Sequence, residues 1–178
     1  MMTDSPENDT RNVLDEFKNM SEDDIRTILD SRGVELEIAI ENTIRDYNMG
    51  TIVRSANAFG IRKIHIIGSR QWNKRGAMKT DAYLDILYHQ TVDEFVDAMA
   101  TDGRRVVAID IRSDAVDVRS VDHTRRAVLV FGAEGPGLSD ELCEKADDVA
   151  FIPQLGSTRS INVGVAAGIA MWEWLRDS

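Results

Sequence analysis

From position 34 onward, short apolar runs alternate with stretches in which apolar residues recur at helical spacing. The apolar runs predict strands at 36–41, 63–68, 84–89, 105–110, 127–131 and 148–152. The helical stretches predict helices at 48–59, from 92 to a stop at Gly103, at 139–145 and at 160–174. Strands this apolar, interleaved with helices, are typical of a mostly parallel sheet with helices on both faces. The sequence therefore predicts an α/β fold.

The last predicted helix has an apolar side made of unusually small residues. Its stripe comprises positions 163, 166, 167, 170, 171 and 174, and Ser160 is the predicted N-cap because a serine hydroxyl accepts an otherwise unpaired backbone N–H. Gly164 and Gly168 lie beside the stripe, and each costs about 1 kcal/mol of helix stability relative to alanine. They indicate that another backbone comes very close. A tightly packed terminal helix without further function is the alternative.

The first 33 residues have a different character. Residues 1–9 are predicted to be a disordered tail, and two short helical patterns follow at 13–17 and 25–29. Ser21 is the expected N-cap of the second pattern, and Gly33 is its expected stop. We therefore divide the chain into an acidic, partly helical arm at 1–33 and one domain at 34–178.

Charge is distributed unevenly along the 178 residues, whose net charge is −10. Residues 1–41 hold 12 acidic and 4 basic side chains, a net charge of −8. Residues 61–80 hold six lysines and arginines and no acid. Although the overall charge disfavours nucleic acid, this window could bind a polyanion locally. A solvated basic loop is the alternative.

Several classes of protein are disfavoured by composition. No stretch approaches the roughly 20 apolar residues of a membrane span, and the N-terminus lacks the basic and apolar regions of a signal peptide. The single cysteine, Cys143, fits a reducing cytoplasm, so we expect a cytoplasmic protein. His65, His89 and His123 follow no metal-ligand spacing, and we predict no metal.

Three polar segments follow predicted strands, where ligands of parallel α/β sheets bind. In the first, at 48–60, helical spacing places Gly50, Arg54 and Asn57 on one face, opposite the apolar side. Arg54 could clamp a phosphate or carboxylate with its planar guanidinium. An ordinary surface arginine is the alternative for this position.

The second segment, Gly-Ala-Glu-Gly-Pro-Gly at 132–137, follows the most apolar strand, and the third, at 156–162, precedes the last helix. Glycines let backbone amides approach a ligand, and Glu134 could orient Arg54 or Asn48. The spacing fits neither a dinucleotide fingerprint nor a P-loop, and a plain turn between strand and helix is the alternative. The residues indicate a polar ligand site but identify no reaction.

Taken together, the three segments resemble the three motifs of the SPOUT superfamily, and specifically its SpoU (TrmH-like) RNA ribose methyltransferases. The first resembles Asn-x-Gly-x-x-x-Arg-Ser-x-x-x-Phe-Gly at 48–60, the second Phe-Gly-x-Glu-Gly-x-Gly-Leu at 131–138, and the third runs from Ile152-Pro153 through Ser-Ile-Asn-Val at 160–163 to Ala166. The resemblance covers roughly residues 36–175. Two residues depart from it: Ile161 stands where the family usually has leucine, and Gly164 where it usually has serine.

The resemblance implies a deep trefoil knot at the C-terminus, a homodimer formed through the knot region and C-terminal helix, and S-adenosylmethionine bound in the knot. Its cofactor contacts map to Ile109, Gly132, Ile152, Ser160 and Ile161. The implied reaction is methylation of a ribose 2′-hydroxyl in tRNA or rRNA, with tRNA slightly favoured. A non-catalytic RNA- or ribosome-binding module on the same fold is the alternative.

The resemblance also implies roles for individual side chains. The family view makes Arg54 the activator of the hydroxyl; since guanidinium normally stays protonated, we favour a role in binding phosphate and stabilising the developing alkoxide. Asn48, Glu134, Ser160 and Asn162 would orient Arg54 and the ribose. The basic side chains expected to meet RNA phosphates are Arg70, Lys74, Arg75 and Lys79.

Overall fold

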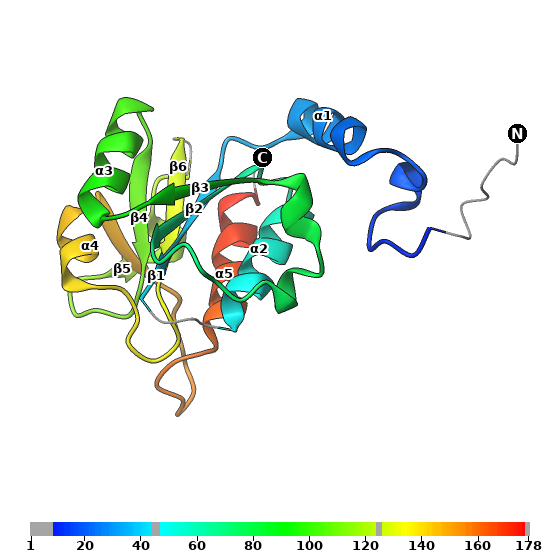
Figure 1. The fold of residues 1–178 in the computed structure, drawn as a ribbon. Coiled ribbons are helices and arrows are strands. Elements are labelled where there is room, and N and C mark those ends of the chain that lie inside the picture. The colour runs from blue at the N-terminus through cyan, green and yellow to red at the C-terminus, as the bar shows by residue number, and fades with distance from the viewer. Residues whose placement is uncertain (1–8, 44–46, 124–125, 177–178) are drawn as a thin grey trace, which may run out of the picture.

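The computed structural model describes residues 9–43, 47–123 and 126–176, and it shows a seven-stranded sheet in the order β3-β2-β1-β6-β4-β7-β5 (Figure 1). Each pair of neighbouring strands is parallel, which confirms the predicted α/β class. The strands are β1 (Glu37–Asn42), β2 (Lys63–Gly68), β3 (Asp85–His89), β4 (Arg105–Ile109), β5 (Val116–Asp117), β6 (Ala127–Phe131) and β7 (Asp148–Phe151). The sequence pattern missed β5, since two residues are too few to show a period.

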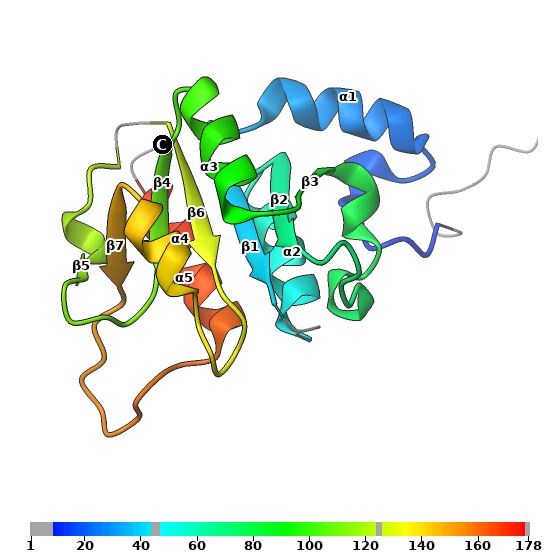
Figure 2. The same ribbon diagram turned by 60° about the vertical axis from the view of Figure 1, so that its left-hand side comes forward.

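Helices cover both faces of the sheet, as predicted. Helices α2 (Asn48–Ala58) and α5 (Val163–Trp174) lie on one face, and α3 (Val92–Thr101) and α4 (Asp140–Lys145) on the other (Figures 1 and 2). Alternate residues of each central strand point into the two layers. In β6, Leu129 and Phe131 pack toward α2 and α5, whereas Val128 and Val130 pack toward α3 and α4.

Four α-helices of the described residues begin with a side-chain cap, whereas α2 begins after Tyr47 without one. The side chains of Ser21, Thr91 and Ser139 each accept a backbone N–H at their helix starts. The prediction that Ser160 opens α5 is wrong: the helix begins at Val163, and its N-cap is Asn162, whose side-chain oxygen accepts from the N–H groups of Gly164 and Val165. The residues before Asn162 belong to no helix, and Ser160 and Ile161 line a pocket described below.

Two glycines in the first half of the chain allow a close approach. A Cβ atom on Gly50 of α2 would stand 2.6 Å from the backbone nitrogen of Ala77, and one on Gly76 would stand 2.9 Å from the nitrogen of Thr51. Gly76 and Ala77 belong to the 3-10 helix η3 (Arg75–Ala77), inside the basic loop. The placing of Gly50 on the polar side of α2 is therefore wrong; it is buried under this loop.

The close neighbour of Gly164 is a side chain of the same chain, and not the backbone that the sequence predicted. A Cβ atom there would meet the Thr51 side chain at 3.1 Å, whereas one on Gly168 would meet nothing within 4 Å. The small residues at the start of α5 thus fit its packing against α2.

The N-terminal arm folds back onto the domain. It contains the 3-10 helix η2 (Asp15–Phe17) and helix α1 (Glu22–Arg32), and α1 lies at the outer edge of the molecule (Figure 1). Phe17 and Ile25 pack with Tyr83 of the 3-10 helix η4 (Thr80–Tyr83). Of the predicted disordered tail, residues 1–8 lie outside the described residues, while Asp9 pairs with Arg11. The domain boundary at 33/34 and the threading of the predicted knot both stay predictions.

Candidate functional site

The three polar segments meet through side-chain hydrogen bonds at the carboxyl ends of the strands. The Asn48 amide donates to Glu134 Oε2 at 2.5 Å, and the Asn162 amide donates to Asn48 Oδ1 at 2.9 Å. Asn162 Nδ2 is also 3.3 Å from both carboxylate oxygens of Glu134. These positions are 86 and 114 residues apart along the chain. We call Asn48, Glu134 and Asn162 the amide–carboxylate cluster.

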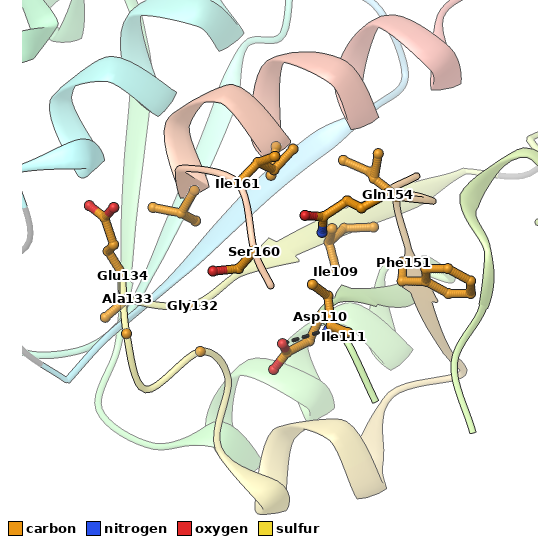
Figure 3. Close-up of a pocket in the computed structure, with 15 residues that line it drawn as sticks. Ile109, Asp110, Ile111, Gly132, Ala133, Glu134, Phe151, Gln154, Ser160 and Ile161 are labelled. Carbon is orange, nitrogen blue, oxygen red and sulfur yellow. Dashed lines mark hydrogen bonds between the residues drawn. The ribbon is translucent and has the colours of Figure 1, made fainter. Parts of the chain in front are cut away.

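A pocket opens beside this cluster, and Figure 3 shows its lining. It lies where β4, β6 and β7 end, and the chain leading into α5 closes its other side. Its walls combine apolar side chains with glycines and polar groups. The lining residues are Ile109, Asp110, Ile111, Gly132, Ala133, Glu134, Gly135, Gly137, Phe151, Ile152, Gln154, Ser160, Ile161, Val163 and Ala166.

The glycine-rich loop after β6 is folded tightly on itself. A Cβ atom on Gly132 would lie 2.2 Å from the carbonyl carbon of Gly137, and Gly137 itself has a φ of +72°. Asp110, directly after β4, fixes the far end of the loop, because its Oδ2 accepts from the N–H of Leu138 at 3.0 Å. The pocket wall is therefore a defined backbone surface that needs glycine at both positions.

All five residues predicted to contact the cofactor, Ile109, Gly132, Ile152, Ser160 and Ile161, line this one pocket. Sequence reasoning missed Asp110 and Gln154. Asp110 had a recognisable signal, since it directly follows a buried strand; Gln154 had none, because its place depends on the path of the extended segment. Gln154 Oε1 is buried and has no hydrogen-bond partner in the described part of the chain.

Arg54 lies outside the pocket lining. Its side chain is exposed on α2, as predicted, on the same face as the exposed residues Thr51 and Ala58. This face adjoins α5, since α2 and α5 pack side by side. Asn48 is the member of the amide–carboxylate cluster on α2, and Arg54 stands six residues further along this helix, roughly 120° around its axis.

The four predicted RNA-binding side chains are exposed on the loop after β2 and make different contacts. Arg70 lies over the Tyr88 ring at 5.0 Å from its centroid. Lys74 pairs with Asp81 at 2.7 Å, and this hydrogen bond raises the pKa of the lysine above its ordinary value. Asp81 stands just beyond the acid-free window in sequence but folds back onto it.

Within the described ranges, no group of three or more His, Cys, Asp and Glu side chains is placed to hold a metal ion. Among the same residues, no helix has both the length and the apolar character needed to cross a membrane.

Residues 35–172, which include the strands, the cluster and the pocket, match the model of the SpoU rRNA Methylase family. The chain belongs to this family. The α/β fold with its parallel sheet is thus the SpoU fold, and the resemblance read from the three motifs is confirmed.

Individual SpoU proteins resemble the chain along most of its length. The tRNA (guanosine(18)-2'-O)-methyltransferase of Escherichia coli is 28% identical over 82% of this chain, which spans 65% of that relative's length. The TrmH/SpoU tRNA modifying enzyme of A. aeolicus superposes with a TM-score of 0.76 at 27% identity, over 87% of this chain and 81% of that one. The AdoMet-bound rRNA methyltransferase of Sinorhizobium meliloti has a TM-score of 0.72 at 31% identity, over 81% and 57%.

Proposed function

We propose that the protein is an S-adenosylmethionine-dependent RNA methyltransferase that methylates a ribose 2′-hydroxyl in tRNA or rRNA. The proposal rests mainly on the position of the amide–carboxylate cluster at the rim of the pocket, with Glu134 belonging to both. Membership in the SpoU family supports the activity. The similarity to a tRNA methyltransferase favours tRNA over rRNA. We expect the enzyme to act in the cytoplasm.

The pocket has the chemistry needed to hold the cofactor. Apolar side chains such as Ile109, Ile152 and Ile161 suit a flat base, and the close-packed glycine loop leaves backbone groups free to approach the ligand. When bound, the cofactor supplies an electrophilic methyl group on a sulfonium centre. A related structure in the family contains AdoMet, which supports this assignment.

The chain's own residues would prepare the ribose hydroxyl. The Asn48 and Asn162 amides are held by Glu134, so their donors and acceptors have fixed directions toward a sugar. Ser160 adds a hydroxyl on the pocket side. Arg54 keeps its charge, binds an RNA phosphate, and stabilises the negative charge that develops on the attacking oxygen.

RNA would approach across the basic loop after β2. Arg70, Arg75 and Lys79 offer exposed charges to backbone phosphates. Lys74 is already paired with Asp81, so its contribution would be smaller than that of its neighbours.

We also propose that two copies pair through α5. Val165, Ile169 and Trp172 are 55%, 42% and 65% exposed and lie at helical spacing along one side of this helix. The exposed face of α2 that carries Arg54 continues this surface, because the Trp172 ring contacts Phe59 directly after α2. A second copy would bury the apolar residues and bring Arg54 to the boundary between the subunits.

The direct test is to incubate the protein with total cellular RNA and labelled S-adenosylmethionine and to map the labelled nucleotide. The expected product is a 2′-O-methylated ribose at a defined position. Methylation on a base would overturn the proposed reaction. Calorimetry with S-adenosylmethionine alone tests the cofactor separately, and a protein that binds RNA but not the cofactor would be a binding module.

A further inference from the structure

Tyr47 is an exposed aromatic residue directly before the amide–carboxylate cluster. Its side chain is 76% exposed, although a tyrosine ring has much apolar surface to bury. Asn48, the next residue, is the member of the cluster that joins Glu134 and Asn162. Consecutive Cα atoms are about 3.8 Å apart, so the backbone of Tyr47 directly adjoins the proposed ribose site.

The Tyr47 ring borders a surface hollow of about 430 Å³. Among the described residues, its lining comprises two aromatic and two amide side chains, those of Tyr47, Gln71, Trp72 and Asn73. Aromatic rings stack on the faces of unpaired nucleobases. This lining therefore suits a nucleobase.

The far wall of the hollow is held rigidly in place. The Asn42 amide, at the end of β1, donates to the carbonyl oxygens of Ser69 at 2.6 Å and Gln71 at 3.0 Å. Trp72 is only 9% exposed and packs into the core under α2. The close approach of Gly50 to η3 locks the same loop to α2. A ligand would thus meet a preformed wall, which reduces the ordering cost of binding.

The rim of the hollow is basic. The Lys74 ammonium lies over the Trp72 ring, 5.3 Å from its centroid, and Arg70 and Arg75 are exposed on the same loop. A base that belongs to an RNA strand carries phosphates on both sides, which these cations would meet. Charge and lining thus favour a base within a strand over a free aromatic compound.

The geometry points to a nucleobase subsite in this hollow. It takes one unstacked base of the substrate RNA, within one nucleotide of the methylated ribose, stacked on the ring of Tyr47. The inference rests on the proposed function and adds to it a substrate requirement: the target lies in a single-stranded or loop region, where a base can leave its stack.

The test measures binding of a single-stranded RNA of about 12 nucleotides with a central 2-aminopurine, followed by fluorescence quenching, and of the matching duplex. Tyr47→Ala is expected to weaken single-strand binding about 5- to 100-fold, the range for losing one base–aromatic stack. Tyr47→Phe should bind within about twofold of wild type, because it keeps the stacking face. Leu14→Ala, an exposed position on the N-terminal arm, is the control and should change nothing.

The dependence of affinity on salt separates stacking from charge. Tyr47→Ala should leave the slope of log Kd against log salt unchanged, since no phosphate contact is lost. The inference is overturned if Tyr47→Ala binds like wild type, if Tyr47→Phe is as weak as Tyr47→Ala, or if the duplex binds as well as the single strand. This assay needs no methyl transfer, so quenching that depends on Tyr47 in a protein without transferase activity would refute the proposed function alone.

Discussion

Arg54 and Asn48 share a helix but point in different directions, and this decides what each can do. Six residues separate them, which places them roughly 120° apart around the axis. Asn48 reaches the cluster at the pocket rim, whereas Arg54 faces the outer surface of α2 beside α5. A role for Arg54 through phosphate and charge, rather than through a cofactor contact, agrees with this arrangement.

Arg54→Ala is therefore expected to separate chemistry from cofactor binding. Methyl transfer to RNA should fall about 100-fold or more, the usual loss when one charge-stabilising donor is removed. The affinity for S-adenosylmethionine, measured by calorimetry, should stay within about twofold of wild type, since Arg54 does not line the pocket. Loss of cofactor binding as well would show that Arg54 supports the structure of the site. The rate of methyl transfer by Arg54→Lys, which keeps the charge but loses the planar guanidinium, should lie between the rates of wild type and Arg54→Ala.

A chain of buried titratable groups crosses the opposite face of the sheet. His65 Nδ1 lies 2.9 Å from His89 Nε2, and His65 Nε2 lies 2.8 Å from Glu37 Oε2. Burial lowers the pKa of His89, and the neighbouring His65 lowers it further, while Glu94 acts weakly in the other sense. Burial alone would raise the pKa of Glu37, but the hydrogen bond from His65 and the charge of Arg104 outweigh it and lower that pKa.

Because of His89, the unfolding free energy should decrease as the pH falls through a defined range. Its folded pKa lies below the unfolded value of 6.5, so the unfolded chain binds a proton more readily. The unfolding free energy, measured in urea from pH 8 to pH 5, should be constant at the alkaline end and decrease as pH falls below about 6.5. Glu37 contributes in a lower window, below its ordinary value of 4.5. His89→Gln should show a shallower slope between pH 7 and 5, and an unchanged slope would remove His89 as the cause.

Among the elements, those with an internal period were predicted well and those defined by contacts were not. β6 was predicted at its observed bounds because it is a continuous apolar run, and β2 was predicted at its bounds because it is a short segment rich in isoleucine that ends at Gly68. η3 and η4 were read only as a basic loop, since their shape depends on packing against α2 and α1. The start of α5 was placed three residues early, because Ser160 and Asn162 are both acceptable N-caps and only tertiary contacts choose Asn162.

The site residues were likewise predicted where strand ends position them and missed where loop contacts do. Motif positions brought Asn48, Glu134 and Asn162 together, because the ends of parallel strands fix where such residues lie. Asp81, which pairs with Lys74, and Gln154 depend on loop paths that no short-range pattern encodes.

The close packing of α2 against η3 can be tested by a substitution at Gly50. Gly50→Ala places a Cβ atom within 3 Å of three backbone atoms of Gly76 and Ala77, so one of the two segments must move. Despite the better helix propensity of alanine, the unfolding free energy should fall by about 1–3 kcal/mol. Ala100→Ser, on the exposed side of α3, should stay within about 0.5 kcal/mol of wild type. If Gly50→Ala instead increased the unfolding free energy, the loop that contains η3 would be free to move away from α2.

Helix α5 leaves an apolar stripe exposed at the surface of the molecule, and the position of this stripe beside α2 favours pairing of two copies. Ile169 stands at the middle of the stripe between Val165 and Trp172. In a two-fold arrangement, the same stripe of each copy would face that of its partner. A charge introduced into the stripe would therefore oppose the same charge on the other copy. Replacing an apolar residue of the stripe would weaken the association of two copies. The stability of the single chain would change little, because the stripe is already exposed in it.

Ile169→Glu is therefore expected to convert a dimer into a folded monomer. Sedimentation analysis should show a dimer for the wild-type protein and a dissociation constant raised about 100-fold or more for the variant, since apolar burial is lost and two carboxylates oppose each other. Leu87→Glu provides a control, because Leu87 is likewise exposed and apolar but lies on β3 at the far edge of the sheet. If the monomeric variant still binds S-adenosylmethionine yet loses methyl transfer, Arg54 acts across the subunit boundary; full activity in the monomer would confine the site to one chain.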